Sequence, residues 1–192
     1  MIDSKNKLDF FLAMDRIALG NDKRRIKIFG DEIWKFQIIL RKYEYLKNKK
    51  KSLLDYIKLI IIKFAYHKLS VKLGFSIPPN VFGPGLSIAH YGTIVVNDHA
   101  NIGKNCRIQE GVNIGSTSGK SDAPQIGNNV FIGSGAKIIG KITIADDVAI
   151  GAGAVVVKSI VETGITVAGV PARKVSNHNS HSNLNHGLIP YY

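Results

Sequence analysis

The sequence has few cysteines, few acidic residues and no long apolar run. Its 192 residues include one cysteine, Cys106, so an internal disulfide is impossible and a metal site built from several cysteines is excluded. No window offers about 18 uncharged apolar residues, which argues against a membrane-spanning helix. Near the N-terminus, Asp9 and Asp15 interrupt what would otherwise be the apolar core of a signal peptide. We therefore expect an intracellular, cytoplasmic protein.

The excess of basic over acidic residues lies mainly in the first half of the chain. Lys and Arg total 26 against 14 Asp and Glu, for a net charge of +12, of which residues 1–75 carry +10. Glycine is rare in this half and frequent afterwards. Pro78 and Pro79 mark the change, because proline resists helix continuation and favours extended geometry before it. We predict three segments: a helical region at 1–75, a β domain at 76–175 and a polar tail at 176–192.

In the first segment, the pattern of apolar residues predicts helices over residues 31–46 and 53–73. Both stretches place apolar residues at helical spacing, and Asp31 is a plausible N-cap. In the second stretch the lysines point in well-separated directions at about 100° per residue. The pattern therefore gives no clean basic face, which weakens the interpretation as a membrane-surface helix. Peripheral membrane association stays open for this basic half.

A basic run lies between these two helices. It comprises Lys47, Lys49, Lys50 and Lys51. Nucleic-acid or anionic-lipid binding is one interpretation, and a solvated loop is the other. We favour the loop and expect no nucleic-acid partner, because no aromatic stacking platform accompanies the run.

A six-residue repeat dominates the second half. Ile or Val recurs at every sixth position from Val96 to Val156, with one double step from Ile114 to Ile126. The register therefore survives an excursion around residues 116–124. Two positions before each Ile the residue is mostly small or β-branched, and the residue after it is often Gly. An α-helix does not repeat at six and an amphipathic strand alternates at two, so the pattern indicates short strands joined by corners.

The repeat predicts a solenoid whose interior is filled by the stacked Ile and Val side chains. Small residues and turn-permitting glycines would shape its corners. Cys106 occupies one of the small positions, and we interpret it as buried packing rather than a reactive thiol, since free cysteine is among the most buried residue types. A short solenoid has exposed ends, and the helical half is placed to cap one of them.

Three further segments support a family resemblance. Residues 85–96 read GLSIAHYGTIVV, residues 115–121 read GSTSGKS and residues 168–173 read AGVPAR. With the repeat, they resemble the hexapeptide-repeat acyltransferases, in the serine O-acetyltransferase-like branch, over roughly residues 74–175. The resemblance implies a mainly β fold, a left-handed parallel β-helix with an N-terminal α-helical region, and assembly as a homotrimer.

The acceptor side departs from the serine acetyltransferases. Where they carry an Asp before the catalytic His, a second Asp upstream and a His beside a Pro, this sequence has Ala89, Phe75 and Ala123. Those groups would normally grip the amine and carboxylate of serine, and losing ionic partners is costly. The resemblance therefore favours the surface-polysaccharide enzymes, which acetylate sugar hydroxyls. Alternatives are an L-serine O-acetyltransferase and a non-catalytic trimeric β-helix that binds a partner.

His90 is the candidate catalytic base, because it occupies the catalytic-histidine segment of the resemblance and imidazole suits proton transfer near neutral pH. A base usually needs an orienting partner. We interpret Ile88 and Ile108 as equivalent positions of adjacent coils, twenty residues apart. The same offset sets Glu110 beside His90, where it would orient or charge-stabilise the imidazole. The alternative is that Glu110 is a surface residue at a coil edge.

The resemblance implies acetyl-CoA as co-substrate and no metal. Small residues would let the pantetheine approach the backbone, and two cations would meet the phosphates. The predicted cofactor-binding residues are Gly115, Ser116, Gly135, Ala136, Gly153, Ala154, Arg173 and Lys174. Residues 115–121 do not form a P-loop, which needs four residues between its first Gly and Gly-Lys, where this chain has three. The tail after Val175, with His178, His181 and His186, is expected to be mobile.

Overall fold

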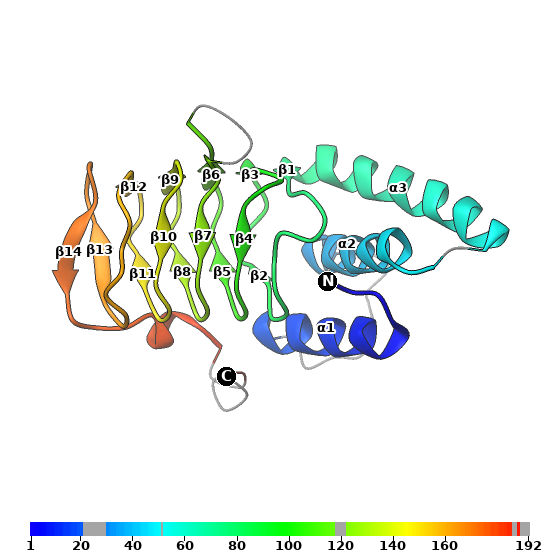
Figure 1. The fold of residues 1–192 in the computed structure, drawn as a ribbon, viewed down its shortest axis with the longest axis horizontal. Coiled ribbons are helices and arrows are strands. Elements are labelled where there is room, and N and C mark those ends of the chain that lie inside the picture. The colour runs from blue at the N-terminus through cyan, green and yellow to red at the C-terminus, as the bar shows by residue number, and fades with distance from the viewer. Residues whose placement is uncertain (21–29, 51, 118–121, 186–187, 189–192) are drawn as a thin grey trace.

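The computed structural model describes residues 1–20, 30–50, 52–117, 122–185 and 188. It places three helices at one end of a solenoid of short strands, as Figure 1 shows. The helices are α1 (Lys5–Ala18), α2 (Glu32–Asn48) and α3 (Leu53–Leu73). Both predicted helices are confirmed, and α3 has the predicted bounds. None of the helices in the described part of the chain combines the length and the hydrophobicity that a membrane span requires.

Local signals start and stop these helices. Ser4 caps α1, because its Oγ accepts a hydrogen bond from the backbone N–H of Lys7 at 3.4 Å. At the start of α3, Asp55 accepts a hydrogen bond from the backbone N–H of Ser52 at 3.0 Å. Gly74 ends α3 with a φ of 78°, a left-handed conformation that glycine adopts without a Cβ penalty.

The predicted basic loop is in part a helix end. Lys47 lies in the last turn of α2, and Lys50 is exposed. Lys49 forms an ion pair with Asp55 at 2.8 Å and lies over the ring of Tyr45. Lys51 lies outside the described residues. Part of this run therefore joins α2 to the start of α3.

Strands of two to four residues build the solenoid. Among the described residues they are β1 (Phe75–Ser76), β2 (Ser87–Ile88), β3 (Ile94–Val96), β4 (Asn101–Ile102), β5 (Arg107–Ile108), β6 (Asn113–Gly115), β7 (Gln125–Ile126), β8 (Phe131–Ile132), β9 (Lys137–Ile139), β10 (Thr143–Ile144), β11 (Ala149–Ile150), β12 (Val155–Val156), β13 (Thr166–Ala168) and β14 (Arg173–Ser176).

Three sheets form the faces of the solenoid. Their strand orders are β1-β3-β6-β9-β12, β10-β7-β4 and β14-β13-β11-β8-β5-β2. Successive strands of the chain move from sheet to sheet, so each coil stacks on the one before it as a parallel β-helix. The exception is the antiparallel pair of β13 and β14 at the far end, which the repeat did not predict.

The predicted register is confirmed. Ile132 pairs with Ile150, 18 positions on, whereas Ile88 pairs with Ile108, 20 positions on, as the predicted two-residue insertion requires. Ile108 pairs with Ile132 across 24 positions, because that coil contains the excursion around residues 116–124. Part of the excursion, residues 118–121, lies outside the described residues.

The Ile and Val stack is the core. None of the ten side chains from Val96 to Val156 at the repeat positions is more than 4% exposed. The small residues two places earlier also point inward, and Cys106 is buried among them. Burial raises the pKa of the Cys106 thiol to about 12, which keeps it a protonated packing group at neutral pH.

The glycines that follow the repeat Ile serve a purpose other than the predicted one. We expected them to permit turns, yet Gly103 and Gly133 have no positive φ. They are needed because neighbouring coils touch their backbone: a Cβ on Gly103 would lie 2.6 Å from the carbonyl oxygen of Gly127, and one on Gly133 would lie 2.7 Å from the backbone nitrogen of Ala152. Left-handed corner positions are held instead by residues such as Asn129, with a φ of 54°.

The helical half caps one end of the β-helix, as predicted. Phe36 and Leu40 of α2 are fully buried and belong to the same core as the stacked Ile side chains. Phe36 packs edge-on against Phe75 of β1, with 5.1 Å between ring centroids. The apolar end of the solenoid is therefore covered by α2.

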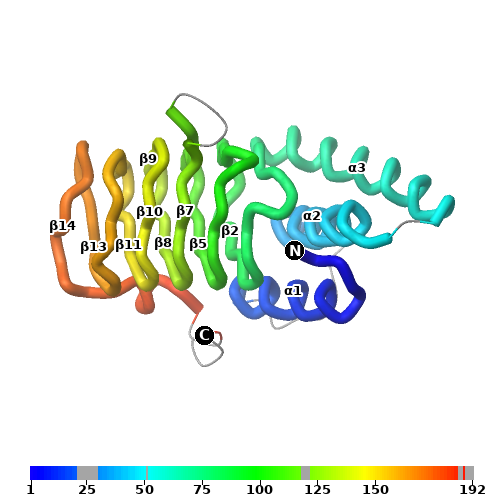
Figure 2. The backbone as a smooth tube through the Cα atoms, in the orientation of Figure 1, coloured from blue at the N-terminus to red at the C-terminus, as the bar shows by residue number. Residues whose placement is uncertain are grey.

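The polar tail is ordered over residues 176–185, so the expectation of a mobile tail was wrong there. After β14 the chain runs back along the solenoid towards α1, as Figure 2 shows. Ser180 is fully buried and its N–H donates to the carbonyl oxygen of Asp147 at 3.0 Å. His181 Nε2 lies 2.8 Å from Asp147 Oδ1. Leu188 packs against Met14 of α1. His186 lies outside the described residues.

Candidate functional site

One corner of the β-helix stacks His90, Glu110 and Ser134 in successive coils. The pairing of Ile88, Ile108 and Ile132 sets this alignment, because each polar residue lies two positions after its Ile. Gly92 follows His90 in the turn that leads to the next sheet, and a Cβ on it would lie 3.2 Å from the Glu110 Cβ. The turn after His90 therefore passes close against Glu110.

Glu110 is held between its two neighbours. Its Oε1 accepts a hydrogen bond from the Ser134 hydroxyl. Its Oε2 is buried and has no hydrogen-bond partner among the described residues. The Ser134 hydrogen bond, a backbone hydrogen bond and the charge of His90 lower the pKa of the Glu110 carboxyl. The group is therefore a carboxylate at neutral pH, with one oxygen anchored and the other unused.

The strand that leads to His90 lies at the edge of its sheet, where α2 supplies its missing partner. Gln37 Nε2 donates to the carbonyl oxygen of Leu86 at 2.8 Å, and Gln37 Oε1 accepts from the backbone N–H of Ile88 at 3.4 Å. Asp15 of α1 accepts hydrogen bonds from the backbone N–H groups of Gly85 and Leu86, both at 2.9 Å. Two helices therefore position the segment that precedes His90.

A buried ionic cluster ties these helices to the first coil. Arg41 is fully buried and donates to Asp15 at 2.7 Å and to Glu44 at 3.0 Å. It also donates to the carbonyl oxygens of Phe82 and Gly83. Burial acts to lower the pKa of Arg41, but the charges of Asp15 and Glu44 outweigh burial and raise it. Arg41 therefore stays charged inside the protein, where its two carboxylate partners compensate its burial.

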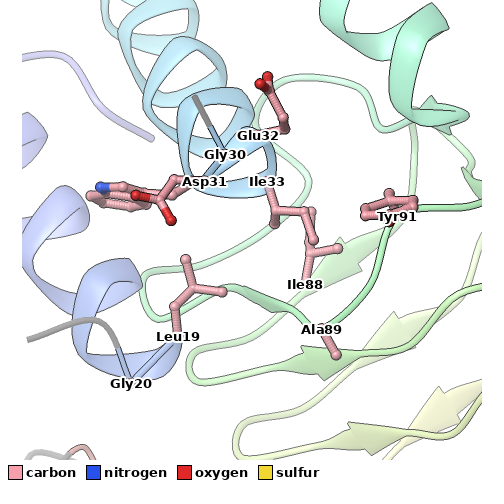
Figure 3. Close-up of a pocket in the computed structure, with 10 residues that line it drawn as sticks. Leu19, Gly20, Gly30, Asp31, Glu32, Ile33, Ile88, Ala89 and Tyr91 are labelled. Atoms are coloured by element: carbon pink, nitrogen blue, oxygen red, sulfur yellow. The ribbon is translucent and has the colours of Figure 1, made fainter. Parts of the chain in front are cut away.

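A pocket of about 440 Å³ lies between the start of α2 and the first coil, and His90 is not among its described lining residues. Ala89 and Tyr91, which flank His90 in the chain, both line it. Figure 3 shows Ile33 of α2 and Ile88 of β2 pointing towards one another in this space. Glu32 also lines it and forms ion pairs with Lys35 and Lys72. The described lining is largely apolar, and it contains acidic side chains but no Lys or Arg.

Three residues depart from the resembled family's pattern on the acceptor side: Ala89, Phe75 and Ala123. They lie in different surroundings. Ala89 faces the pocket. Phe75 is buried in the core, and Ala123 is buried as well. None of these positions therefore offers a carboxylate or imidazole to an acceptor.

The predicted cofactor-binding residues fall in three places. Gly135 and Gly153 lie at the corner that holds Glu110 and Ser134, and both have positive φ. Space around Gly153 is open, since nothing lies within 4 Å of where its Cβ would be. Ala136 and Ala154 follow these glycines but are fully buried. Both residues therefore serve the interior packing and expose no atoms to a ligand in this chain.

The other predicted cofactor-binding residues lie away from this corner. Gly115 ends β6, and Ser116 Oγ accepts a hydrogen bond from Asn97 at 3.3 Å, at the next corner of the coil. Arg173 and Lys174 are exposed on β14, where Lys174 pairs with Glu162. Of the predicted set, the structure therefore brings only this glycine pair to the corner that stacks His90, Glu110 and Ser134.

Ser134, Gln37 and Asp15 were missed from the sequence. Ser134 could have been found by extending the coil offset from Glu110, since it shares the stacking position. Gln37 and Asp15 carry no local signal, because their partners lie 49 and 70 positions away. Among the described residues, no group of three His, Cys, Asp or Glu side chains could hold a metal ion.

Comparisons with known proteins agree with this architecture. The family described as bacterial transferase hexapeptide (six repeats) matches residues 123–158. A serine acetyltransferase from Synechococcus elongatus is 34% identical over 119 residues, which are 60% of this chain and 48% of that protein. The chain therefore spans about half the length of this relative.

Solved structures match over more of the chain. Serine acetyltransferase from Brucella abortus aligns with a TM-score of 0.72 and 28% identity, covering 92% of this chain and 72% of that one. A second structure of that enzyme contains coenzyme A, with a TM-score of 0.70 and 28% identity. The Neisseria gonorrhoeae enzyme, solved with serine, has a TM-score of 0.66 and 29% identity, covering 90% and 71%.

These matches support the hexapeptide-repeat acyltransferase family, with serine acetyltransferases as the named relatives. They also imply the left-handed sense of the β-helix behind an N-terminal helical region. None of them supports the surface-polysaccharide branch that the sequence favoured.

Proposed function

We propose that this chain is an acetyl-CoA-dependent O-acetyltransferase with His90 as its general base. The observation that carries the proposal is the stack in which the Glu110 carboxylate lies between His90 and the Ser134 hydroxyl. The relatives and structural neighbours, which are acetyltransferases by name, support the same reaction class.

The reaction begins when His90 removes the proton of an acceptor hydroxyl. The oxygen then attacks the carbonyl carbon of the acetyl thioester and forms a tetrahedral oxyanion. Collapse of this intermediate breaks the carbon–sulfur bond, and the CoA thiolate leaves. The imidazolium of His90 returns the proton to the thiolate, so the products are the acetyl ester and CoA thiol.

In this scheme Glu110 acts through His90. An ionised carboxylate beside the ring stabilises the imidazolium that forms during proton transfer and restricts the ring orientation. Ser134 in turn keeps the Glu110 side chain in place. Glu110 is therefore a positioning residue, whereas His90 meets the reacting atoms.

Acetyl-CoA supplies the activated acetyl group. Gly135 and Gly153 are the best-placed of the predicted contacts, because they are small, exposed in part and next to the stack. Arg173 and Lys174, on the last strand, would hold phosphates if the cofactor extends along the solenoid, and Gly115 and Ser116 would meet it from the next corner. A homotrimer belongs to this proposal, since it would place a second chain beside these surfaces.

L-Serine is the first acceptor to test. The named relatives are serine acetyltransferases, and one neighbour was solved with serine. A sugar hydroxyl is the second candidate, and a specific observation favours it. Ala89 and Phe75 offer no carboxylate for an amine.

The test measures thiol release from acetyl-CoA by the wild-type chain and by His90→Ala. L-Serine is offered in one series, and sugars and nucleotide sugars in another. Loss of a general base should lower turnover by about a hundredfold or more. His99→Ala is the matched control, because His99 is exposed at another corner of the same coil.

Thiol release in either acceptor series would support the proposed acetyltransferase activity. Release that depends on His90 with serine identifies an amino-acid acetyltransferase, and release with a sugar alone identifies the second candidate. Equal turnover of His90→Ala and wild type would refute the assigned base. Absence of both turnover and acetyl-CoA binding would favour the non-catalytic alternative.

A further inference from the structure

Helix α3 is apolar on two opposite sides. One side packs against the protein through half-buried or buried residues such as Leu59, Tyr66, Leu69 and Leu73. The other side faces away from the body, along the outer edge of the helical end in Figure 1. In a water-exposed helix that second side would ordinarily be polar.

The outward side carries large apolar side chains. Each of them is more than half exposed: Leu53, Leu54, Tyr56, Ile57, Ile60, Ile61, Phe64 and Val71. Steps of three and four residues connect Leu53, Ile57, Ile60 and Phe64, which places them in one stripe along the helix. Scattered exposed apolar residues need no explanation, but a continuous stripe indicates an interaction site.

The packed side explains why the sequence concealed this stripe. Apolar residues on two opposite sides cancel in any measure of amphipathic character. Once α2 and the first coil cover one side, only the other side meets the surroundings. The side of α3 that stays exposed in the folded protein is therefore much more apolar than the pattern of the whole helix indicates.

Positive charges outnumber negative ones around the stripe, where Lys72 pairs with Glu32 of α2 at 3.6 Å. Lys58, Lys63, Lys68 and Lys72 project from α3 and are exposed. Asp55 is the only acidic residue of the helix, and it is buried in an ion pair with Lys49. Long lysine stems can lie along an apolar surface while the ammonium groups reach outward to anions.

A groove continues the apolar surface towards the other helices. It has a volume of about 340 Å³ and lies where α1, α2 and α3 meet. Its apolar lining includes Leu8, Leu46 and Ile61, and Ile61 also belongs to the exposed set. Three lysines surround it, Lys5, Lys42 and Lys58. Apolar walls with ammonium groups at the rim suit an acyl chain beneath an anionic headgroup.

We propose that the outer side of α3, with this groove, binds the surface of an anionic lipid bilayer. The apolar stripe would enter the boundary between headgroups and acyl chains, and the lysines would meet the headgroup phosphates. A second copy of the helix fits less well. Pairing two such sides would bring Lys63 and Lys68 close to the lysines of the copy, with no exposed acidic residue on α3 to neutralise them.

Vesicle flotation tests the proposal with the full chain. One set of vesicles contains phosphatidylcholine and phosphatidylglycerol, and the other contains phosphatidylcholine alone. We expect the wild type to bind the anionic set much more strongly. Lys63→Gln/Lys68→Gln should weaken that binding about thirtyfold, the effect of two surface lysines. Ile60→Gln/Phe64→Gln should weaken it about a hundredfold, because both side chains leave the acyl boundary.

Val157→Gln/Val161→Gln is the matched control, because both valines are exposed on the β-helix far from α3. It should bind like the wild type. Circular dichroism checks that each variant is folded, and the lysine variant keeps the test valid if the apolar variant unfolds. Equal wild-type binding to both vesicle sets, or unchanged binding by the lysine variant, would overturn the proposal.

Sedimentation velocity of the same proteins separates a membrane from a second copy. If Ile60→Gln/Phe64→Gln dissociates an oligomer and the wild type ignores anionic vesicles, the stripe is an interface between chains. Thiol release from acetyl-CoA is measured separately, so failure of lipid binding and failure of the acetyltransferase proposal can be distinguished.

Discussion

The β-helix and the helical half use apolar and charged residues in opposite ways. In the β-helix, repeat positions from Val96 to Val156 are buried in one continuous stack. In the helical half, Ile60 and Phe64 are among eight large apolar residues exposed on α3, whereas Arg41 and Asp15 are fully buried. A solenoid is held by the same local contact repeated in each coil, but the helices attach through a few specific contacts over long sequence distances.

This comparison predicts that removing one buried charge in the helical half lowers the free energy of unfolding more than shortening one stacked side chain in the solenoid does. Removing one partner of a buried ionic cluster typically costs about 3–5 kcal/mol, because the other charges are left unpaired. We expect Arg41→Leu to approach that loss of unfolding free energy. Asp15 and Glu44 would both lose their cation, and the segment before His90 would lose its anchor.

Urea denaturation measures the effect. Ile132→Val is the control in the solenoid and should cost about 0.5–1.5 kcal/mol, the usual cost of removing one buried methylene. A smaller effect for Arg41→Leu than for Ile132→Val would contradict the contrast between the two regions.

A second test concerns the close stacking of coils. In Gly133→Ala the new Cβ would lie 2.7 Å from the backbone nitrogen of Ala152, so the coils must separate. Overpacking of this kind typically costs about 1–3 kcal/mol. Thermal unfolding compares this variant with Gly115→Ala, where the nearest atom is a side-chain oxygen at 3.2 Å. Equal midpoints would show that the coils are less tightly constrained than the structure indicates.

The smallest expected effect concerns the site between the two regions. Glu110→Gln keeps the shape of the side chain but removes its charge, and we expect turnover to fall about tenfold with little change in KM. Asp9→Asn, which changes an exposed carboxylate of α1 that pairs with Lys5, is the control. Unchanged turnover across the pH range would mean that Glu110 does not act on His90.

The same carboxylate has a consequence for pH. Its pKa is lowered in the folded protein by the Ser134 hydrogen bond and by His90. A lowered folded-state pKa contributes stability above the ordinary carboxyl pKa, and that contribution is lost as the pH falls through the folded value. The stability difference between wild type and Glu110→Gln should therefore narrow in acid. Urea denaturation at neutral and acidic pH measures the change.

Much of the β-helix and part of the site could be predicted from sequence. The coil offset correctly paired Ile88 with Ile108 and brought Glu110 next to His90, because a repeat converts sequence distance into spatial distance. The interpretation of the repeat glycines was wrong, since close contact between coils, rather than φ, requires Gly103 and Gly133. The comparisons support serine acetyltransferases as the named relatives, and not the surface-polysaccharide branch that the three substitutions favoured.

Features that depend on local order follow from the sequence alone: the six-residue repeat, its buried stack, the bounds of the helix over residues 53–73 and the alignment of the stacked corner. The folded structure was needed to show which side of α3 is covered, how Gln37 and Asp15 hold the strand before His90, and where the tail packs. Periodicity encodes contacts at fixed spacing, whereas packing of α1, α2 and the tail depends on contacts between distant segments that no local pattern records.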